Sequence, residues 1–205
     1  MVQHRIGVTK SQDTYEMTGD FWEALAEPEQ QDTVPSNEVP LANSFETRRL
    51  FLAAIEGSDG SRRAVSDTVP DFDSRHADLY GTAGWLLAFV HKETPKQTNG
   101  REVRRWGLTS DGKKYLKLHE LGETEAAREL LVAAIRDVEI VQRVYEITEA
   151  DGEISYDSLR ETLSVETTLS EASVARRAST VAQWLTALPG VEAVTDGRSK
   201  KFVRV

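Results

Sequence analysis

Residues 170–205, SEASVARRASTVAQWLTALPGVEAVTDGRSKKFVRV, decide the fold that we predict for this chain. The first half of the stretch carries apolar residues at helical spacing, and Ser170 at its start is a favoured helix N-cap. The helical pattern ends at Pro189-Gly190, and two strand-like runs follow on either side of Asp196-Gly197, a dipeptide that favours a tight hairpin turn. The stretch therefore predicts a helix and then a two-stranded hairpin.

Two further helices are predicted before this one, at residues 155–163 and at the end of an apolar-striped segment, 124–148. The chain from Phe45 to Thr109 repeats the same order. Its predicted elements are helices at 45–56, 61–69 and 75–89 and a strand at 101–109. Three helices followed by a hairpin, or wing, is the order of elements in a winged helix-turn-helix domain.

We therefore expect a mainly α fold with small β wings, of the α+β class, in which a long helix joins two winged helix-turn-helix domains. The predicted divisions are a flexible acidic N-terminal arm (1–44), a first winged-helix domain (45–122), a long connecting helix shared with the second domain (123–148), and a second winged-helix domain (149–205). Within the arm, residues 20–26 could form two helical turns, which either dock on the chain itself or bind a partner.

Local signals refine the predicted helices. Ser44, with Thr47 three residues later, predicts a capped start, and Gly57 predicts the end of that helix. Gly81 and Gly84 weaken the helix at 75–89, and close approach to another backbone would explain them. The connecting helix is expected to be continuous, with a break near Asp137 as the alternative, and its apolar stripe exceeds what one neighbour need cover, which suggests a homodimer through residues 124–148.

The net charge of −9 is unevenly distributed along the 205 residues. Residues 1–44 carry −6, residues 45–120 carry +2 and residues 121–205 carry −5, whereas residues 173–205 carry +4. The acidic composition, with 17 Arg and only 8 Lys, resembles that of proteins from extremely halophilic archaea. The total charge therefore does not exclude nucleic acid as a partner, because phosphate contacts depend on local cations.

Several classes of protein are excluded or disfavoured. The longest apolar run is too short to span a bilayer and the N-terminus lacks a signal-peptide core, so we expect a cytoplasmic protein without a membrane partner. The absence of cysteine excludes disulfides and thiol chemistry. The four histidines have no metal-binding spacing, and neither a Walker loop nor a nucleophile elbow occurs, so we expect no enzyme activity, metal or cofactor.

Basic and polar residues gather where winged helices touch DNA. In the second domain the predicted contacts lie on the third helix and the wing: Ser173, Arg176, Arg177, Thr180, Gln183, Arg198, Lys200 and Lys201. In the first domain they lie at the starts of the second and third helices and on the wing: Arg62, Arg63, Arg75, His76, Arg101, Arg104 and Arg105. A solvated charged surface remains the alternative explanation for both sets. Trp85 and Trp184 occupy similar places near the ends of the two third helices and are expected to anchor the core.

Two motifs carry a resemblance to a known group of proteins. The run Arg176-Arg177-Ala178-Ser179-Thr180-Val181-Ala182-Gln183-Trp184-Leu185 and the run from Arg75 through Trp106-Gly107-Leu108-Thr109 to Gly112 resemble a tandem winged-helix region that accompanies restriction and other defence proteins in archaea and bacteria. In the first domain the Leu-Gly-Leu of that region is Trp85-Leu86-Leu87. The resemblance implies DNA binding, whereas the nuclease or ATPase domain that usually accompanies the region has no counterpart in this sequence.

We therefore expect a protein that binds double-stranded DNA and regulates transcription. The alternative is a non-catalytic protein-interaction or DNA-targeting adaptor subunit of a defence or replication complex. The two differ in the charge of the third helices and wings, which DNA binding requires to be positive and which an adaptor would leave acidic or apolar.

Overall fold

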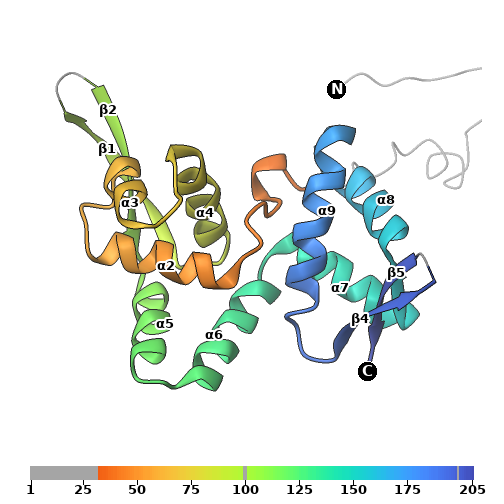
Figure 1. Cartoon of the computed structure of the whole chain (residues 1–205). Helices are drawn as coiled ribbons and strands as arrows, with labels where there is room; N and C mark the ends of the chain where they lie inside the picture. Colours follow the sequence, from red (N-terminus) through yellow and green to blue (C-terminus); the bar gives the residue numbers. More distant parts are fainter. Residues whose placement is uncertain (1–31, 99–100, 198) are drawn as a thin grey trace, which may run out of the picture. The chain divides into compact units, whose positions relative to one another are not determined.

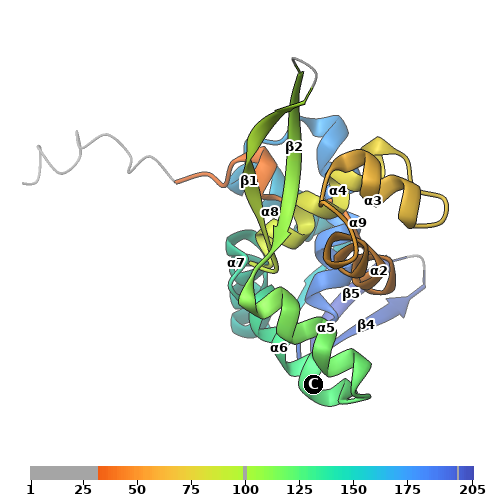
Figure 2. The same cartoon turned by 90° about the vertical axis from the view of Figure 1, so that its left-hand side faces the viewer.

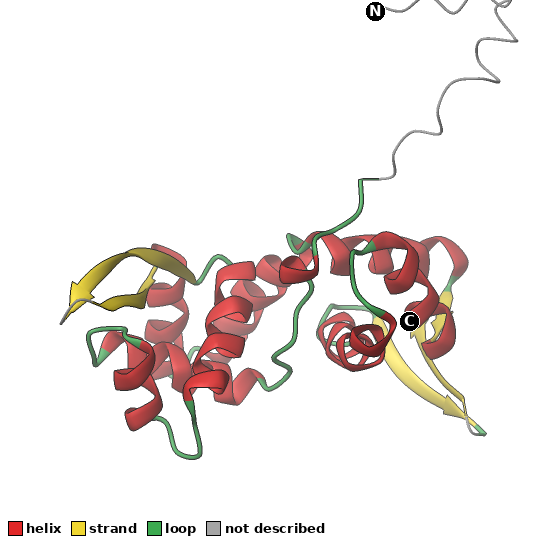
Figure 3. Cartoon of the chain, turned by 90° about the horizontal axis from the view of Figure 1, so that it is seen from above, coloured by secondary structure: helices red, strands yellow, loops and turns green. Residues whose placement is uncertain are grey.

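A computed structural model of the chain describes residues 32–98, 101–197 and 199–205 (Figure 1). Residues Thr33–Val205 form one compact unit. This unit is mainly helical and contains two small antiparallel sheets, which confirms the predicted α+β class. Figure 3, coloured by secondary structure, shows the two sheets as separate pieces among helices. None of the helices in the described ranges is long and apolar enough to cross a membrane.

The first half of the unit has the predicted order of three helices and a hairpin, although no strand was predicted over residues 90–98, which form its first strand. The elements are α2 (Phe45–Glu56), α3 (Arg62–Thr68), α4 (Ser74–Leu86), β1 (Val90–Thr98) and β2 (Arg101–Leu108). The two strands pair antiparallel from Val90↔Leu108 outward, and they run together as a hairpin in Figure 2. Ser61, just before α3, forms an isolated antiparallel bridge with Arg105 of β2.

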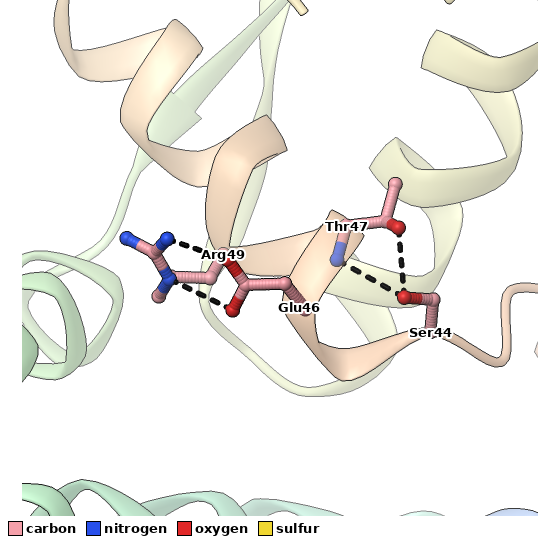
Figure 4. Close-up of polar contacts among 4 residues, drawn as sticks. All are labelled: Ser44, Glu46, Thr47 and Arg49. Atoms are coloured by element: carbon pink, nitrogen blue, oxygen red, sulfur yellow. Dashed lines mark hydrogen bonds and ion pairs between the residues drawn. The ribbon is translucent and has the colours of Figure 1, made fainter. Parts of the chain in front are cut away.

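Helix α2 begins as the sequence predicts. The Ser44 hydroxyl accepts a hydrogen bond from the backbone N–H of Thr47 at 3.1 Å and another from the Thr47 hydroxyl at 2.7 Å (Figure 4). In the same turn the Arg49 guanidinium pairs with the Glu46 carboxylate at 2.6 Å. The predicted end at Gly57 is also confirmed, since Gly57 is the C-cap.

The second half repeats the first. Its elements are α7 (Glu139–Asp151), β3 (Glu153–Ser155), α8 (Tyr156–Glu166), α9 (Glu171–Leu185), β4 (Val191–Asp196) and β5 (Ser199–Arg204). The three strands form one antiparallel sheet in the order β3-β5-β4. The short strand β3 pairs with β5 in the place where Ser61 bridges to β2 in the first half. Both halves, which we call the first and second repeats, thus follow one connectivity.

The registers of the repeats also correspond. Val90 begins β1, and Val191 begins β4, 101 positions later. The same offset relates the buried residues Ala77, Tyr80 and Ala83 of α4 to Ala178, Val181 and Trp184 of α9, which are also buried. Trp85 is therefore not the counterpart of Trp184. It is only partly buried, with the ammonium of Lys92 4.2 Å from its ring centroid.

The connecting helix is not continuous, and the break near Asp137, which the sequence left as the alternative, is confirmed. After α5 (Ser110–Glu120) the chain forms α6 (Thr124–Arg136), turns at Asp137 and Val138, and starts again as α7. Val138 and Ile140 are both buried. Residues two positions apart lie on nearly opposite sides of a straight helix, so an unbroken helix could not bury both. The break lets both side chains reach the core.

The same burial removes the reason for expecting a homodimer. The stripe that was to be covered by a second copy is buried within the chain at Leu131, Ile135, Val138 and Val141, and Leu130 packs against the core.

Residues 33–44, which we call the strap, are not a flexible arm. Val34 forms a parallel bridge with Thr167, and Val39 and Ala42 are buried. The strap then leads directly into α2. The predicted arm is therefore wrong for these residues, because their apolar side chains are covered by the core. Residues 1–31, including the predicted helical turns at 20–26, lie outside the described residues.

The glycines of α4 approach side chains rather than another backbone. A Cβ at Gly81 would lie 2.3 Å from the indole of Trp106 on β2, and a Cβ at Gly84 would lie 3.2 Å from the Val90 side chain. Gly81 therefore lets the hairpin pack tightly against α4.

Candidate nucleic-acid interface

Helix α9 presents three distinct faces. One face is the core side, where Val174, Ala178, Val181 and Leu185 are buried. A second face is exposed, and its residues are Glu171, Ala172, Ala175, Arg176, Ser179 and Gln183. The third face lies against the strap. This division follows from the helical period, since positions three or four apart share a face.

The strap face contains two residues that the sequence analysis assigned to DNA. The Arg177 guanidinium donates to the carbonyl oxygen of Val39, and the Thr180 hydroxyl donates to that of Leu41 at 3.3 Å. Burial lowers the pKa of Arg177, and nearby Arg176 lowers it further. Thr180 is only 3% exposed, so its expected outward orientation is wrong. The cause is the strap, which covers this face and satisfies both donors.

The exposed face carries the remaining predicted α9 contacts. Arg176 and Gln183 are both exposed. Within the described part of the chain, the Arg176 guanidinium makes no ion pair. Ser179, one turn after Arg176, completes a row with Arg176 and Gln183, which we call the α9 row. Ser173 lies near the start of the helix and is partly exposed, and its hydroxyl accepts a hydrogen bond from Ser170 at 3.0 Å.

The hairpin of the second repeat carries one exposed cation among its described side chains close to the turn. The Lys200 ammonium lies 5.4 Å from the centroid of the Phe202 ring. Lys201 instead pairs with Glu153 of β3 at 2.8 Å, which joins the central strand β5 to the outer strand β3. Arg198 lies outside the described residues.

Most of the predicted contacts in the first repeat are engaged within the protein. Arg62 pairs with Asp78 at 2.6 Å and Arg105 with Asp59 at 2.9 Å, whereas Arg63 makes a longer pair with Asp67, 3.6 Å, on the surface of α3. The side chains of Arg101 and Arg104 lie outside the part of the chain that the structure describes. Surface pairs of this kind contribute little to stability, but they leave fewer free cations for phosphate.

His76 is part of the helix start rather than a free cation. The Asp73 carboxylate accepts from the His76 backbone N–H at 2.8 Å, and the His76 ring nitrogen accepts from the Asp73 N–H at 3.4 Å. The His76 ring also stacks on Phe72, with centroids 5.5 Å apart. The hydrogen bond from His76 lowers the pKa of Asp73.

Arg75 is the counterpart of Arg176 by the 101-residue offset. It is exposed and, among the described residues, has no ion-pair partner. The same offset places Asp78 and Thr82 opposite Ser179 and Gln183. The row on α4 thus contains a carboxylate, which Arg62 neutralises, and is less basic than the α9 row. Of the two rows, only the α9 row therefore lacks a carboxylate, as DNA binding favours.

Sequence reasoning missed a buried cation between the repeats. Arg48 of α2 is 1% exposed, and its guanidinium lies 4.9 Å from the ring centroid of Phe45 and 4.7 Å from that of Trp184. It donates to the carbonyl oxygen of Ala42 at 3.1 Å. The signal was present, because Arg48 lies three residues after Phe45 and three before Phe51, both apolar residues of the predicted helix at 45–56.

The described residues contain no group of three or more histidine, aspartate or glutamate side chains that could hold a metal ion. The chemistry that the exposed faces of α9 and of the hairpin can perform is therefore hydrogen bonding and charge pairing, which suits a polyanion.

Comparison of the sequence with known proteins identifies one family. Residues 52–189 match the model of a domain of unknown function, DUF7226. The chain belongs to the DUF7226 family. No curated protein and no solved structure matches it. In this DUF7226 protein the matched residues begin within α2 and end after α9, so they include the α9 row, whereas the strap and the β4-β5 hairpin lie outside the match.

Proposed function

We propose that this DUF7226 protein binds double-stranded DNA through two winged helix-turn-helix domains, the first and second repeats, and acts in the cytoplasm as a transcriptional regulator. The shared connectivity of the repeats supports this assignment, because each places a helix α4 or α9 directly before a hairpin. In such domains the third helix enters the major groove and the hairpin contacts the backbone.

The observation that carries the proposal is the α9 row. Arg176 and Gln183 have the donor groups that pair with guanine and adenine edges, and Ser179 can bond to a base or a phosphate. The neighbouring exposed residues Ala172 and Ala175 are small, which allows the helix backbone to approach the groove closely. The α9 row itself carries no carboxylate, and the exposed Glu171 lies at the start of the helix, one turn before Ala175. Repulsion from phosphate is therefore confined to the first turn of α9.

The hairpin of the second repeat would hold the duplex in register. Lys200 is exposed near the turn, where a flexible ammonium can reach a phosphate oxygen. Lys201 would act indirectly, since its pair with Glu153 ties β5 to β3.

The test is the replacement Arg176→Ala, measured by fluorescence anisotropy on a duplex that the full-length chain selects from a random pool. A lost base contact of this kind costs about 1–3 kcal/mol, so we expect affinity to fall by about fivefold to 150-fold. Arg128→Ala is the matched control, because Arg128 is an exposed arginine on α6 that pairs with Glu125 at 3.6 Å. Equal affinities of the two variants would refute the assignment of the α9 row.

A protein-interaction adaptor is the second candidate, and the outer side of α4 favours it for the first repeat. Leu79, Trp85 and Leu86 are only partly buried there, beside the carboxylate of Asp78. The replacement Arg75→Ala separates the two functions. If α4 contacts DNA, this variant lowers both the affinity and the salt dependence of binding, whereas a protein-binding α4 leaves both unchanged.

A further inference from the structure

The strap connects the two repeats through a single short stretch of backbone. Three donors on α9, one helical turn apart, reach successive parts of it: Arg177 bonds to Val39, Thr180 to Leu41 and the Trp184 indole N–H to Ala42 at 3.2 Å. Seven helical residues rise about 10.5 Å, and three extended residues span about 10 Å. The two spacings match, so the strap runs along α9 with its carbonyl groups in register with the donors.

The end of the strap is held by both repeats at once. The Ala42 carbonyl oxygen accepts from Trp184 of α9 and also from Arg48 of α2, at 3.2 and 3.1 Å. The Arg48 guanidinium stacks on the Trp184 ring, which brings α2 and α9 into direct contact. A displacement of α9 relative to α2 would therefore disturb three interactions together: the Trp184–Ala42 and Arg48–Ala42 hydrogen bonds and the contact between Arg48 and the Trp184 ring.

Burial makes this connection stable. Val34 and Val39 are no more than 1% exposed, and the backbone of Val34 exchanges hydrogen bonds with Glu166 and Thr168 at 2.8 and 3.0 Å. Fully burying an aliphatic side chain contributes about 1.5–3 kcal/mol. The strap is thus bound along its length, from the loop before α9 to the start of α2.

We propose that the strap couples the two repeats so that they bind one duplex as a single unit, with Arg177 and Thr180 acting as positioning residues rather than DNA contacts. This inference rests on the proposed DNA binding. Arg177 and Thr180 act through the strap, and the strap determines how the α9 row is presented relative to α4.

The test compares Arg177→Met with Val39→Ala, which weakens the strap from its own side. Affinity for the selected duplex is measured by anisotropy over a range of salt concentrations. We expect each variant to bind about tenfold more weakly with an unchanged salt slope, and the double variant to lose little more than either single one, since both break the same connection. If Val39→Ala fails to fold, Thr180→Val replaces it, because that change removes the hydroxyl donor and keeps the side-chain volume.

If Arg177 contacts a phosphate, Arg177→Met should instead lower the magnitude of the salt slope by about 0.9. Its loss of affinity should then add to that of Val39→Ala in the double variant. Either result would overturn the inference. Hydrogen exchange of the free protein provides a readout independent of DNA: Arg177→Met should raise exchange in residues 33–44 and in both α2 and α9. Unchanged exchange in these segments would refute the coupling of the repeats through the strap and would leave the proposed DNA binding in place. Failure of the unaltered chain to select any duplex, with exchange behaving as expected, would refute DNA binding itself.

Discussion

Arg48 shows how a single side chain can be charged and yet belong to the core. Burial lowers its pKa to about 10, so the guanidinium still carries its charge at neutral pH. Among the described residues its Nε and Nη1 atoms have no hydrogen-bond partner, and no carboxylate pairs with it. Its compensation comes from two aromatic rings and one carbonyl oxygen. Desolvation of an ion costs several kcal/mol, whereas each cation–π contact contributes about 2 kcal/mol when buried.

We therefore expect Arg48→Met to keep the free energy of unfolding within about 1 kcal/mol of the unaltered chain, or to raise it. A methionine fills a similar volume and contacts the Phe45 and Trp184 rings through sulfur, and the Ala42 carbonyl keeps the indole as its donor. Arg48→Ala should cost about 2–4 kcal/mol because it leaves a cavity. Urea unfolding checks both, and a methionine variant as unstable as the alanine variant would show that the charge itself is required.

At the scale of elements, α4 and its hairpin depend on a residue without a side chain. Gly81 lies under the Trp106 indole, which is itself 7% exposed and is covered on its other sides. Gly84 lies one turn along the same helix but faces a valine at a distance that a small shift can relieve. Two glycines with the same helix propensity therefore have different roles.

Replacement of each glycine by alanine should separate these roles. Alanine favours a helix by about 1 kcal/mol over glycine, so Gly84→Ala should leave the free energy of unfolding nearly unchanged or raise it. Gly81→Ala should lower it by about 1–3 kcal/mol, because its methyl group overlaps the buried indole. The urea midpoint at constant m-value measures the difference, and an equal response of the two variants would contradict the packing argument.

At the scale of the whole molecule, the two repeats share their supports. Arg48 of the first repeat contacts Trp184 of the second. The strap is bridged to Thr167, just after α8, and leads into α2. Neither repeat can lose its packing without exposing residues of the other. This arrangement differs from the sequence-based expectation of two domains separated by a connecting helix.

We expect residues 33–205 to unfold in one transition. In differential scanning calorimetry the measured enthalpy should equal the van't Hoff enthalpy, because shared supports make unfolding cooperative. Two resolved transitions, or a calorimetric enthalpy well above the van't Hoff value, would mean that the repeats unfold independently.

The sequence by itself determined most of the helices, the second hairpin and the repeated order of elements, whereas strands over the residues of β1 and β3 were not predicted. The cap at Ser44, the stops at Gly57 and Pro189-Gly190, and the periodic apolar residues are local signals that act over a few residues. The sequence also identified Arg176 and Gln183 as members of the candidate interface, because both fall opposite the apolar face of α9.

Only the tertiary structure decided which polar side chains remain exposed and available to a partner. The strap has no periodicity, so nothing local predicts that it covers Arg177 and Thr180, more than 130 positions away. The pairing of Arg62 with Asp78 likewise depends on neighbours brought together by packing. Secondary structure follows from short-range patterns, whereas the exposure of a side chain depends on every segment that folds against it.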